Sequence, residues 1–156
     1  MPRRDIFHAI VRTALEKDGW IITHDPLFLE WEDAIYYPDL GAEKIIAATK
    51  DAQKIAVEIK TFLGQVSQQE FYEALGQFDN YAIALSEIEP DRKLVLAIPI
   101  LAYETFFQRQ FVKRVIAIKK ITLLVYNVEN QKIEKWIWKQ IIKKLSANYS
   151  KNTNPI

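Results

Sequence analysis

A strand–helix–strand unit in the middle of the chain constrains the fold more than any other feature of the sequence. Gln53 to Phe62 is the clearest strand, and its successive side chains face opposite sides. The run Ser67-Gln68-Gln69-Glu70 matches a capping box, and an apolar stripe at helical spacing follows it to about Leu85. A buried strand is expected next, at Lys93 to Ile98. Because the helix is long enough to act as a crossover, we expect the two strands to be parallel neighbours in one sheet.

The rest of the chain contributes further helices and strands. The other expected elements, in chain order, are a helix from about Arg4 to Lys17, a short apolar stretch at Trp20 to Thr23, a turn at His24-Asp25-Pro26, strands at Ala34 to Leu40 and Lys44 to Thr49 joined near Gly41, a third helix through Tyr103, Phe107, Phe111 and Val115, and a closing hairpin at Ile121 to Tyr126 and Ile133 to Trp138. The chain is therefore predicted to be a mixed α/β single domain over residues 1–145, with a central mixed β-sheet flanked by helices. Residues 146–156 are expected to form a polar, frayed C-terminal tail.

The composition excludes several kinds of site. The 156 residues contain no cysteine, which removes disulfides, thiolate zinc sites and a cysteine nucleophile. A bound metal would therefore need oxygen ligands or one of the two histidines. No stretch approaches the ~20 apolar residues that a membrane span needs, so the protein is expected to be cytoplasmic, with no membrane partner.

Charge is unevenly distributed, although the formal net charge is only +1. Residues 1–104 carry 18 acidic and 10 basic side chains, whereas residues 105–156 carry 2 acidic and 11 basic ones. This division suits a protein that binds a cation with one part and a polyanion with the other. A merely solvated surface fits the same distribution.

The residues that suggest chemistry lie in two short stretches, Pro38-Asp39 and Glu58-Ile59-Lys60. Glu58 and Lys60 share one face of an apolar strand, two rises of about 3.3 Å apart. A carboxylate placed there needs a compensating partner, and Lys60 alone is insufficient if folding brings Asp39 beside Glu58. A divalent cation relieves the repulsion between two carboxylates, and such oxygen ligands suit Mg²⁺. The ion can polarise a phosphate, while a neighbouring lysine positions or deprotonates the attacking water.

Each of these residues also has a purely structural interpretation. Pro38-Asp39-Leu40-Gly41 is a common turn sequence, and Glu58-Ile59-Lys60 is also typical of the solvated face of a strand. Their joint occurrence, separated by about nineteen residues and in this order of elements, favours a shared site.

These residues resemble two nested groups of proteins. Pro38-Asp39 and Glu58-Ile59-Lys60, in the order helix, strands, helix, are similar to the motif of the PD-(D/E)XK nuclease superfamily. More narrowly, RDIFHAIVRTALEKDGW (4–20), PDLGAEKIIAA (38–48), KIAVEIKTF (54–62) and EALGQFDNY (73–81) resemble the fdxN-element excision controlling factor family of the XisH type, from cyanobacteria. The resemblance extends to about Lys139. It implies a protein associated with site-specific excision of a DNA element, built on a restriction-endonuclease-like core.

The resemblance also implies roles for individual residues. Asp39 and Glu58 would be the metal carboxylates, Ile59 would lend its backbone carbonyl, and Lys60 would be the catalytic lysine. The implied metal is Mg²⁺, with Mn²⁺ as a substitute. Gln77 matches a glutamine that several branches of the superfamily carry on the helix after the lysine, where it contacts the site or the DNA. Simple solvation is the alternative for Gln77.

The first helix departs from the pattern of relatives that use an acid there, because no glutamate occupies its inward edge. Asp5 and Glu16 fall opposite its apolar stripe, and His8 flanks that stripe. His8 is the candidate for an accessory catalytic group, against a hydrogen-bonded surface histidine. His24 is better explained as a turn residue.

DNA would be bound through phosphate contacts, which are independent of base sequence and sensitive to salt. The densest basic patch comprises Arg109, Lys113, Arg114, Lys119 and Lys120. Nearby Phe106, Phe107 and Phe111 follow helical spacing and favour a core role over base stacking. Trp136 and Trp138 alternate on the last strand, which suggests a face covered by a second subunit in a homodimer.

Two hypotheses from different classes remain. The first is a Mg²⁺-dependent DNA endonuclease or nickase that cuts a phosphodiester by water attack. The second is a non-catalytic accessory factor that binds DNA or a partner protein and assists a separate recombinase or companion excision factor. A plain oligomeric scaffold is a third. No helix-turn-helix or zinc finger that would read a DNA sequence is visible.

Overall fold

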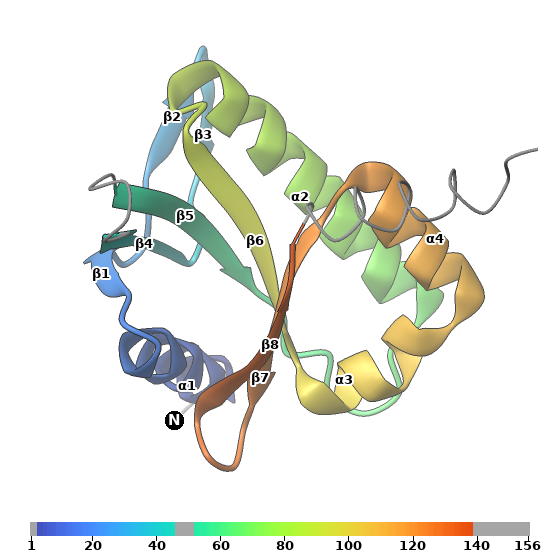
Figure 1. The fold of residues 1–156 in the computed structure, drawn as a ribbon. Coiled ribbons are helices and arrows are strands. Elements are labelled where there is room, and N and C mark those ends of the chain that lie inside the picture. Colours follow the sequence, from blue (N-terminus) through green and yellow to red (C-terminus); the bar gives the residue numbers. More distant parts are fainter. Residues whose placement is uncertain (1–2, 46–51, 139–156) are drawn as a thin grey trace, which may run out of the picture.

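Six strands form one mixed sheet in the order β1-β4-β5-β6-β7-β8 (Figure 1). The computed structural model describes residues 3–45 and 52–138. The strands are β1 (Ile21–His24), β4 (Leu40–Ile45), β5 (Ala52–Ile59), β6 (Arg92–Pro99), β7 (Thr122–Asn127) and β8 (Lys132–Ile137). The pairs β5–β6 and β6–β7 are parallel and the other three are antiparallel, which confirms the predicted crossover.

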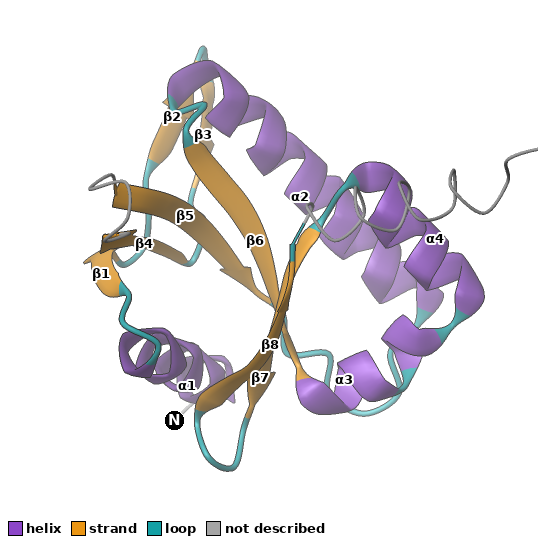
Figure 2. Cartoon of the chain, viewed as in Figure 1, coloured by secondary structure: helices purple, strands orange, loops and turns teal. Residues whose placement is uncertain are grey.

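Helices cover both faces of this sheet (Figures 1 and 2). On one face lies α1 (Arg3–Lys17). On the other lie α2 (Gln68–Ile88), α3 (Ile100–Glu104), the 3₁₀ turn η1 (Phe106–Gln108) and α4 (Gln110–Lys119). Within residues 3–45 and 52–138, no helix is long and apolar enough to cross a membrane.

The capping box predicted at the start of α2 is present. The Ser67 hydroxyl accepts a hydrogen bond from the Glu70 N–H at 3.0 Å, and the Glu70 carboxylate accepts one from the Ser67 N–H. The apolar stripe of α2 then packs on the sheet, with Phe71 completely buried at its start. The cap fixes where α2 begins, and so fixes how its polar side chains lie over the end of β5.

The region before β4 differs from the sequence prediction. A separate hairpin of β2 (Leu29–Trp31) and β3 (Ala34–Tyr36) packs against α2. The strand predicted at Ala34 to Leu40 is confirmed only over β3, because residues 37–39 interrupt it, and the three-residue β2 was not predicted. Gly41 lies inside β4 rather than at a joint between two strands. A Cβ at Gly41 would meet His24 Nδ1 at 3.0 Å, so glycine here permits a close approach and not a turn. Residues 46–49 of the predicted second strand, and the predicted tail at 146–156, lie outside the described residues.

The predicted continuous third helix is wrong. Between α3 and α4 the backbone leaves the helical region at Thr105 (φ −110°, ψ −86°) and again at Arg109 (φ −65°, ψ 140°). Phe106 and Phe107 are both buried, and they lie in the 3₁₀ turn η1 between the two helices. The break turns both rings onto Phe71, at centroid distances of 5.3 and 5.7 Å, and confirms their predicted core role.

Candidate functional site

Asp39 and Glu58 lie where the pairing of β4 with β5 ends. Asp39 directly precedes β4, whose first residue, Leu40, pairs with Val57, the neighbour of Glu58. The Ile59 N–H donates to Asp39 Oδ2 at 2.8 Å on the β4 side, while the Lys60 N–H donates to the Ala97 carbonyl of β6 at 2.9 Å. The Asp39 carboxylate is thus bound to the residue after Glu58, and the charges of both carboxylates act on Tyr81 of α2.

Both carboxylates are buried, with exposed fractions of 8% for Asp39 and 4% for Glu58. Two buried carboxylates on one face repel each other unless positive charge or hydrogen bonds compensate them. Folding therefore brings together the two acids that the sequence analysis assigned to a metal. In the described part of the chain, no group of three or more Asp, Glu or His side chains is placed to hold a metal ion. The protein donors on offer are two carboxylates and backbone oxygen, a set that fits Mg²⁺ with water completing its shell.

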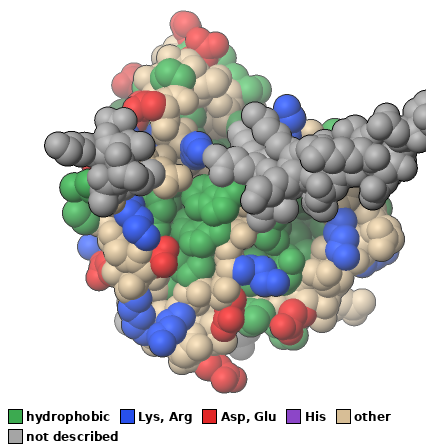
Figure 3. All heavy atoms as spheres, viewed as in Figure 1, with side chains coloured by type: hydrophobic (Ala, Val, Ile, Leu, Met, Phe, Trp, Pro, Cys, Tyr) green, Lys and Arg blue, Asp and Glu red, His purple; other side chains and the backbone are tan. Residues whose placement is uncertain are grey.

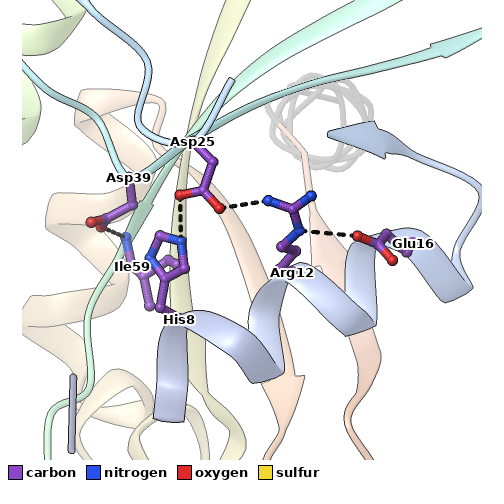
Figure 4. Close-up of polar contacts among 6 residues, drawn as sticks. All are labelled: His8, Arg12, Glu16, Asp25, Asp39 and Ile59. Carbon is purple, nitrogen blue, oxygen red and sulfur yellow. Dashed lines mark hydrogen bonds and ion pairs between the residues drawn. The ribbon is translucent and has the colours of Figure 1, made fainter. Parts of the chain in front are cut away.

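Pro38 contributes to the end of the ladder between β4 and β5. It lies just before β4 and, as a proline, has no N–H with which to extend the pairing that begins at Leu40 and Val57. The Asp39 carboxylate accepts the Ile59 N–H in place of a backbone carbonyl (Figure 4). The ladder between β4 and β5 thus ends here, beside the two acids.

Lys60 lies at the end of β5 and its ammonium is held by α2. Lys60 Nζ donates to Gln77 Oε1 at 2.5 Å, and the Tyr126 hydroxyl donates to the Lys60 carbonyl at 2.9 Å. A hollow of about 530 Å³ opens beside this contact and is lined by Lys60, Gln77, Glu70 and Glu73, among other residues. Lys60 and Gln77 are therefore brought together, and their roles at a metal site stay a prediction.

Tyr81 is a site residue that the sequence analysis missed. Gln77 Nε2 donates to the Tyr81 hydroxyl at 3.0 Å, one helical turn further along α2. Burial raises the pKa of Tyr81 to about 12; the charge of Glu58 adds to the shift, the hydrogen bond from Gln77 opposes it, and the charge of Asp39 and a hydrogen bond to Glu58 add further. The signal in the sequence was the four-residue spacing of Gln77 and Tyr81, which places both on one face of a helix.

His8 lies on α1 in a chain of polar contacts (Figure 4). Its Nε2 is 2.7 Å from Asp25 Oδ1, and Asp25 Oδ2 accepts a hydrogen bond from Arg12 at 2.6 Å. Arg12 also reaches Glu16, at 3.1 Å, so this candidate acid on α1 serves as an ion-pair partner. The side chain of Asp5 lies outside the described residues. Asp25, which the sequence analysis left as part of a turn, connects His8 to the segment next to Pro38, because the Leu27 N–H donates to the Pro38 carbonyl at 3.0 Å.

The predicted basic patch divides into residues with different surroundings. Lys113, Arg114 and Lys120 are exposed. Lys119 is bound to Asp79 of α2 at 2.8 Å. Arg109 precedes α4 and stacks on Phe111, with its guanidinium carbon 4.8 Å from the ring centroid. Arg109 also lines a second hollow, of about 600 Å³, whose wall includes residues 64–66 of the loop that begins at Lys60.

The two tryptophans proposed to mark a dimer contact are both partly buried in the single chain. Trp136 and Trp138 stack at a centroid distance of 4.6 Å, and Trp136 also packs on Trp20 at 5.8 Å. Figure 3 shows hydrophobic side chains gathered in the centre of one face, with Lys and Arg side chains around them. The homodimer stays a prediction.

Fold and site together define a class: a mixed α/β domain with two buried carboxylates at the end of a strand pair, followed by a lysine. The sequence model of the XisH family, described as XisH protein, matches residues 1–134, and the chain belongs to this family. A crystal structure of an fdxN element excision controlling factor protein from Anabaena variabilis is 48% identical, with 86% of this chain and 99% of that chain covered and a TM-score of 0.78. An XisH family protein from Nostoc punctiforme is 44% identical, with 85% and 99% covered and a TM-score of 0.77. No curated protein matches the chain.

Proposed function

We propose that this protein is a Mg²⁺-dependent DNA endonuclease or nickase of the PD-(D/E)XK type that takes part in the excision of a DNA element. One observation carries the proposal: Asp39 and Glu58, distant in sequence, are both buried where the pairing of β4 with β5 ends, and Lys60 directly follows β5. The description of the Anabaena relative supports the second part, because that protein is an excision controlling factor.

Asp39, Glu58 and the Ile59 carbonyl would hold the metal. When bound, Mg²⁺ supplies charge that polarises a DNA phosphate and makes a coordinated water more acidic. The chain's own contribution is to hold both carboxylates in place before the ion arrives. Asp39 is fixed by the Ile59 N–H, and Glu58 belongs to a strand hydrogen-bonded on both sides.

Lys60 orients the attacking water and hydrogen-bonds the phosphate. Attack by water forms a new P–O bond and breaks the bond to the leaving sugar oxygen. The attacking water gives up a proton to solvent and the leaving oxygen takes one from solvent, which leaves a phosphate and a hydroxyl at the nick. Gln77 holds the ammonium at the edge of the 530 Å³ hollow, where it is accessible to a phosphate. His8, oriented by Asp25, is the accessory group on the α1 side.

Phosphates on either side of the cut would be bound by the basic patch. Three residues of the patch are exposed and suited to this role: Lys113, Arg114 and Lys120. The guanidinium of Arg109 is held in place by stacking on Phe111. Lys119 contributes less, because Asp79 competes for its charge. This binding would be strongly salt-dependent and independent of base sequence.

A plasmid-nicking assay with Mg²⁺ or Mn²⁺ tests the proposal. The parent should convert supercoiled to nicked or linear DNA, and Lys60→Ala and Asp39→Asn should abolish the conversion. Lys54→Ala is the matched control, because Lys54 lies on the same strand in an ion pair with Asp91 at 3.9 Å. It should cut like the parent.

Failure to cleave any DNA form with either metal, while DNA binding is retained, would overturn the enzymatic proposal. It would favour the second candidate, a non-catalytic factor that binds DNA or a partner and assists a recombinase. One observation already favours that candidate: the Anabaena relative is described as a controlling factor.

A further inference from the structure

The hairpin of β2 and β3, with the residues next to it, carries three large apolar side chains that remain in contact with solvent. Phe28, Ile35 and Tyr37 are 51%, 52% and 55% exposed. The neighbours of Phe28 point the other way, because Leu27 and Leu29 are both buried. The hairpin therefore has one side in the core and one apolar side turned to solvent, which we call the hairpin face.

The exposed side chains of the hairpin face form one patch. The rings of Phe28 and Tyr37 are in contact, with centroids 5.6 Å apart. Exposure alternates from Ala34 to Tyr37, which places Ile35 on the same side as Tyr37. Isolated exposed apolar residues are ordinary on a protein surface, whereas large apolar side chains gathered in water are typical of a binding surface.

The charge on and beside the hairpin face is negative. Glu30 is exposed and lies opposite Ile35 in the register of β2 and β3. Glu32 and Asp33 are exposed in the turn that joins the two strands. Residues 25–39 contain five acidic side chains and no Lys, Arg or His. The hairpin face is thus an apolar patch with an acidic border.

This combination of apolar surface and negative charge selects the class of partner. DNA is disfavoured, because the acids repel its phosphates. A protein segment with apolar side chains between Lys or Arg complements both the rings and the charges. We propose that the hairpin face docks another protein through a segment of this kind. The proposal goes beyond the nuclease function and does not depend on it.

A partner bound to the hairpin face would lie beside the candidate site. The hairpin lies next to α2 and outside the six-stranded sheet (Figure 1). Its inner side packs on that helix through Tyr36, whose ring meets that of Tyr81 edge-on at 5.6 Å. Tyr37 is followed directly by Pro38 and Asp39. The partner would therefore contact the segment that leads to Asp39, while the exposed basic residues of α4 stay available for DNA.

Three short labelled peptides serve as probes, with binding followed by fluorescence anisotropy. The first has an apolar core of Leu and Phe flanked by Lys, the second has the same core flanked by Glu, and the third has a Ser core flanked by Lys. The parent should bind the first at least about 10-fold more tightly than either of the others. Equal affinity for all three peptides would overturn the proposal.

The double variant Phe28→Ser with Tyr37→Ser tests the apolar patch. It should weaken binding of the first peptide by about 10-fold or more, because two aromatic contacts are lost. Both side chains are exposed, so urea unfolding should show a stability close to that of the parent. Tyr72→Ser is the matched control, since Tyr72 is 50% exposed near the start of α2, and it should bind like the parent. An equal loss in this control would also overturn the proposal.

The triple variant Glu30→Gln, Glu32→Gln and Asp33→Asn tests the acidic border. It should reduce the preference for the Lys-flanked over the Glu-flanked peptide by about 10-fold. Glu129→Gln, in the turn between β7 and β8, should leave that preference unchanged. The triple variant changes only exposed side chains by removing charge, so it decides the matter even where the aromatic variant fails to fold. An unchanged preference would contradict the proposal.

Two further measurements test other occupants of the hairpin face. A labelled oligothymidine strand and a labelled duplex test DNA. If the double aromatic variant loses DNA binding but still binds the first peptide like the parent, the face belongs to DNA and the proposal is wrong. Sedimentation velocity tests a second copy of this chain. A dimer of the parent that the double variant abolishes would assign the face to self-association instead.

Discussion

The two faces of β5 differ in what their side chains do. On the α1 face, Ile55 and Val57 are completely buried in an apolar cluster. On the α2 face, Ala56 is equally buried, but Glu58 follows it two residues later and Lys60 continues the same side at the end of the strand. One strand therefore contributes stability through one face and a candidate site through the other. Residues that differ by a single position in sequence should respond to substitution in opposite ways.

The largest expected effect on stability comes from adding a charge to the apolar face of β5 and removing one from the other face. Val57→Asp places a carboxylate in the α1 cluster, where no cation compensates it in the described structure, and should lower the free energy of unfolding by more than about 4 kcal/mol or prevent folding. Glu58→Gln removes a charge that faces Asp39 and should leave stability equal or raise it by about 1 kcal/mol, while abolishing Mg²⁺ binding. Urea unfolding and calorimetry measure both. Similar stability losses in the two variants would contradict the comparison.

Arg92 extends the comparison to the opposite end of β5. Its buried guanidinium donates to the Ile55 carbonyl at 3.0 Å and to Glu89 at 2.8 Å. Arg92→Ala should cost about 2–3 kcal/mol of unfolding free energy, because those acceptors lose a charged partner. Mg²⁺ affinity should not change, because Arg92 lies beside Lys54 in the register of β5 and β6, four residues before Glu58. A loss of metal binding in a folded Arg92→Ala protein would show that the two ends are not independent.

Much of this arrangement can be predicted from the sequence, for a physical reason. The alternation through Glu58 and Lys60 is local, and so is the capping box, so periodicity and spacing identify both. The approach of Asp39 to Glu58 depends on the register of β4 on β5, which begins at Leu40 and includes Gly41, a glycine that the sequence analysis assigned to a joint between two strands. Local patterns do not contain that register, although the family resemblance anticipated the pair.

What the sequence missed depends on tertiary contacts. Tyr81 has the spacing of any helical residue, and only its packing on Tyr36, from an unpredicted hairpin, places its hydroxyl in the site. Likewise, the helix break at Thr105 places the buried Phe106 and Phe107 in a separate 3₁₀ turn, which the helical spacing of the aromatic residues in this segment does not indicate.

Two buried tyrosines, one on each face of the sheet, sharpen the comparison at high pH. Burial raises the pKa of Tyr81 to about 12, from an ordinary value of 10.0, and burial also raises that of Tyr126. A raised phenol pKa contributes stability that is fully present below pH 10 and is lost as the pH rises through the folded value. The parent should lose roughly 1–3 kcal/mol more than Tyr81→Phe between about pH 10 and pH 12.

Urea unfolding of the parent and Tyr81→Phe at several alkaline pH values measures this difference. Tyr126→Phe removes the buried hydroxyl on the α1 face, and it too should lose less unfolding free energy than the parent as the pH rises. Identical pH dependence in all three proteins would show that neither hydroxyl is desolvated as the structure indicates.

The smallest effects concern two lysines of α4. Lys113 is exposed, whereas Lys119 pairs with Asp79. Lys113→Ala should reduce the slope of log affinity for DNA against log salt by about 0.9, the contribution of one phosphate contact. Lys119→Ala should change that slope less and cost under about 1 kcal/mol of stability. Fluorescence anisotropy with a labelled duplex at several salt concentrations measures the slopes, and a larger change for Lys119 would reverse the assignment.

A crystal soaked with Mn²⁺ and measured at the manganese absorption edge tests the central claim most directly. The account predicts one anomalous peak within bonding distance of the carboxylates of Asp39 and Glu58 and of the Ile59 carbonyl, and its loss in crystals of Glu58→Gln. A strong peak bound elsewhere, or none at this position in crystals that retain the parent fold, would contradict the account.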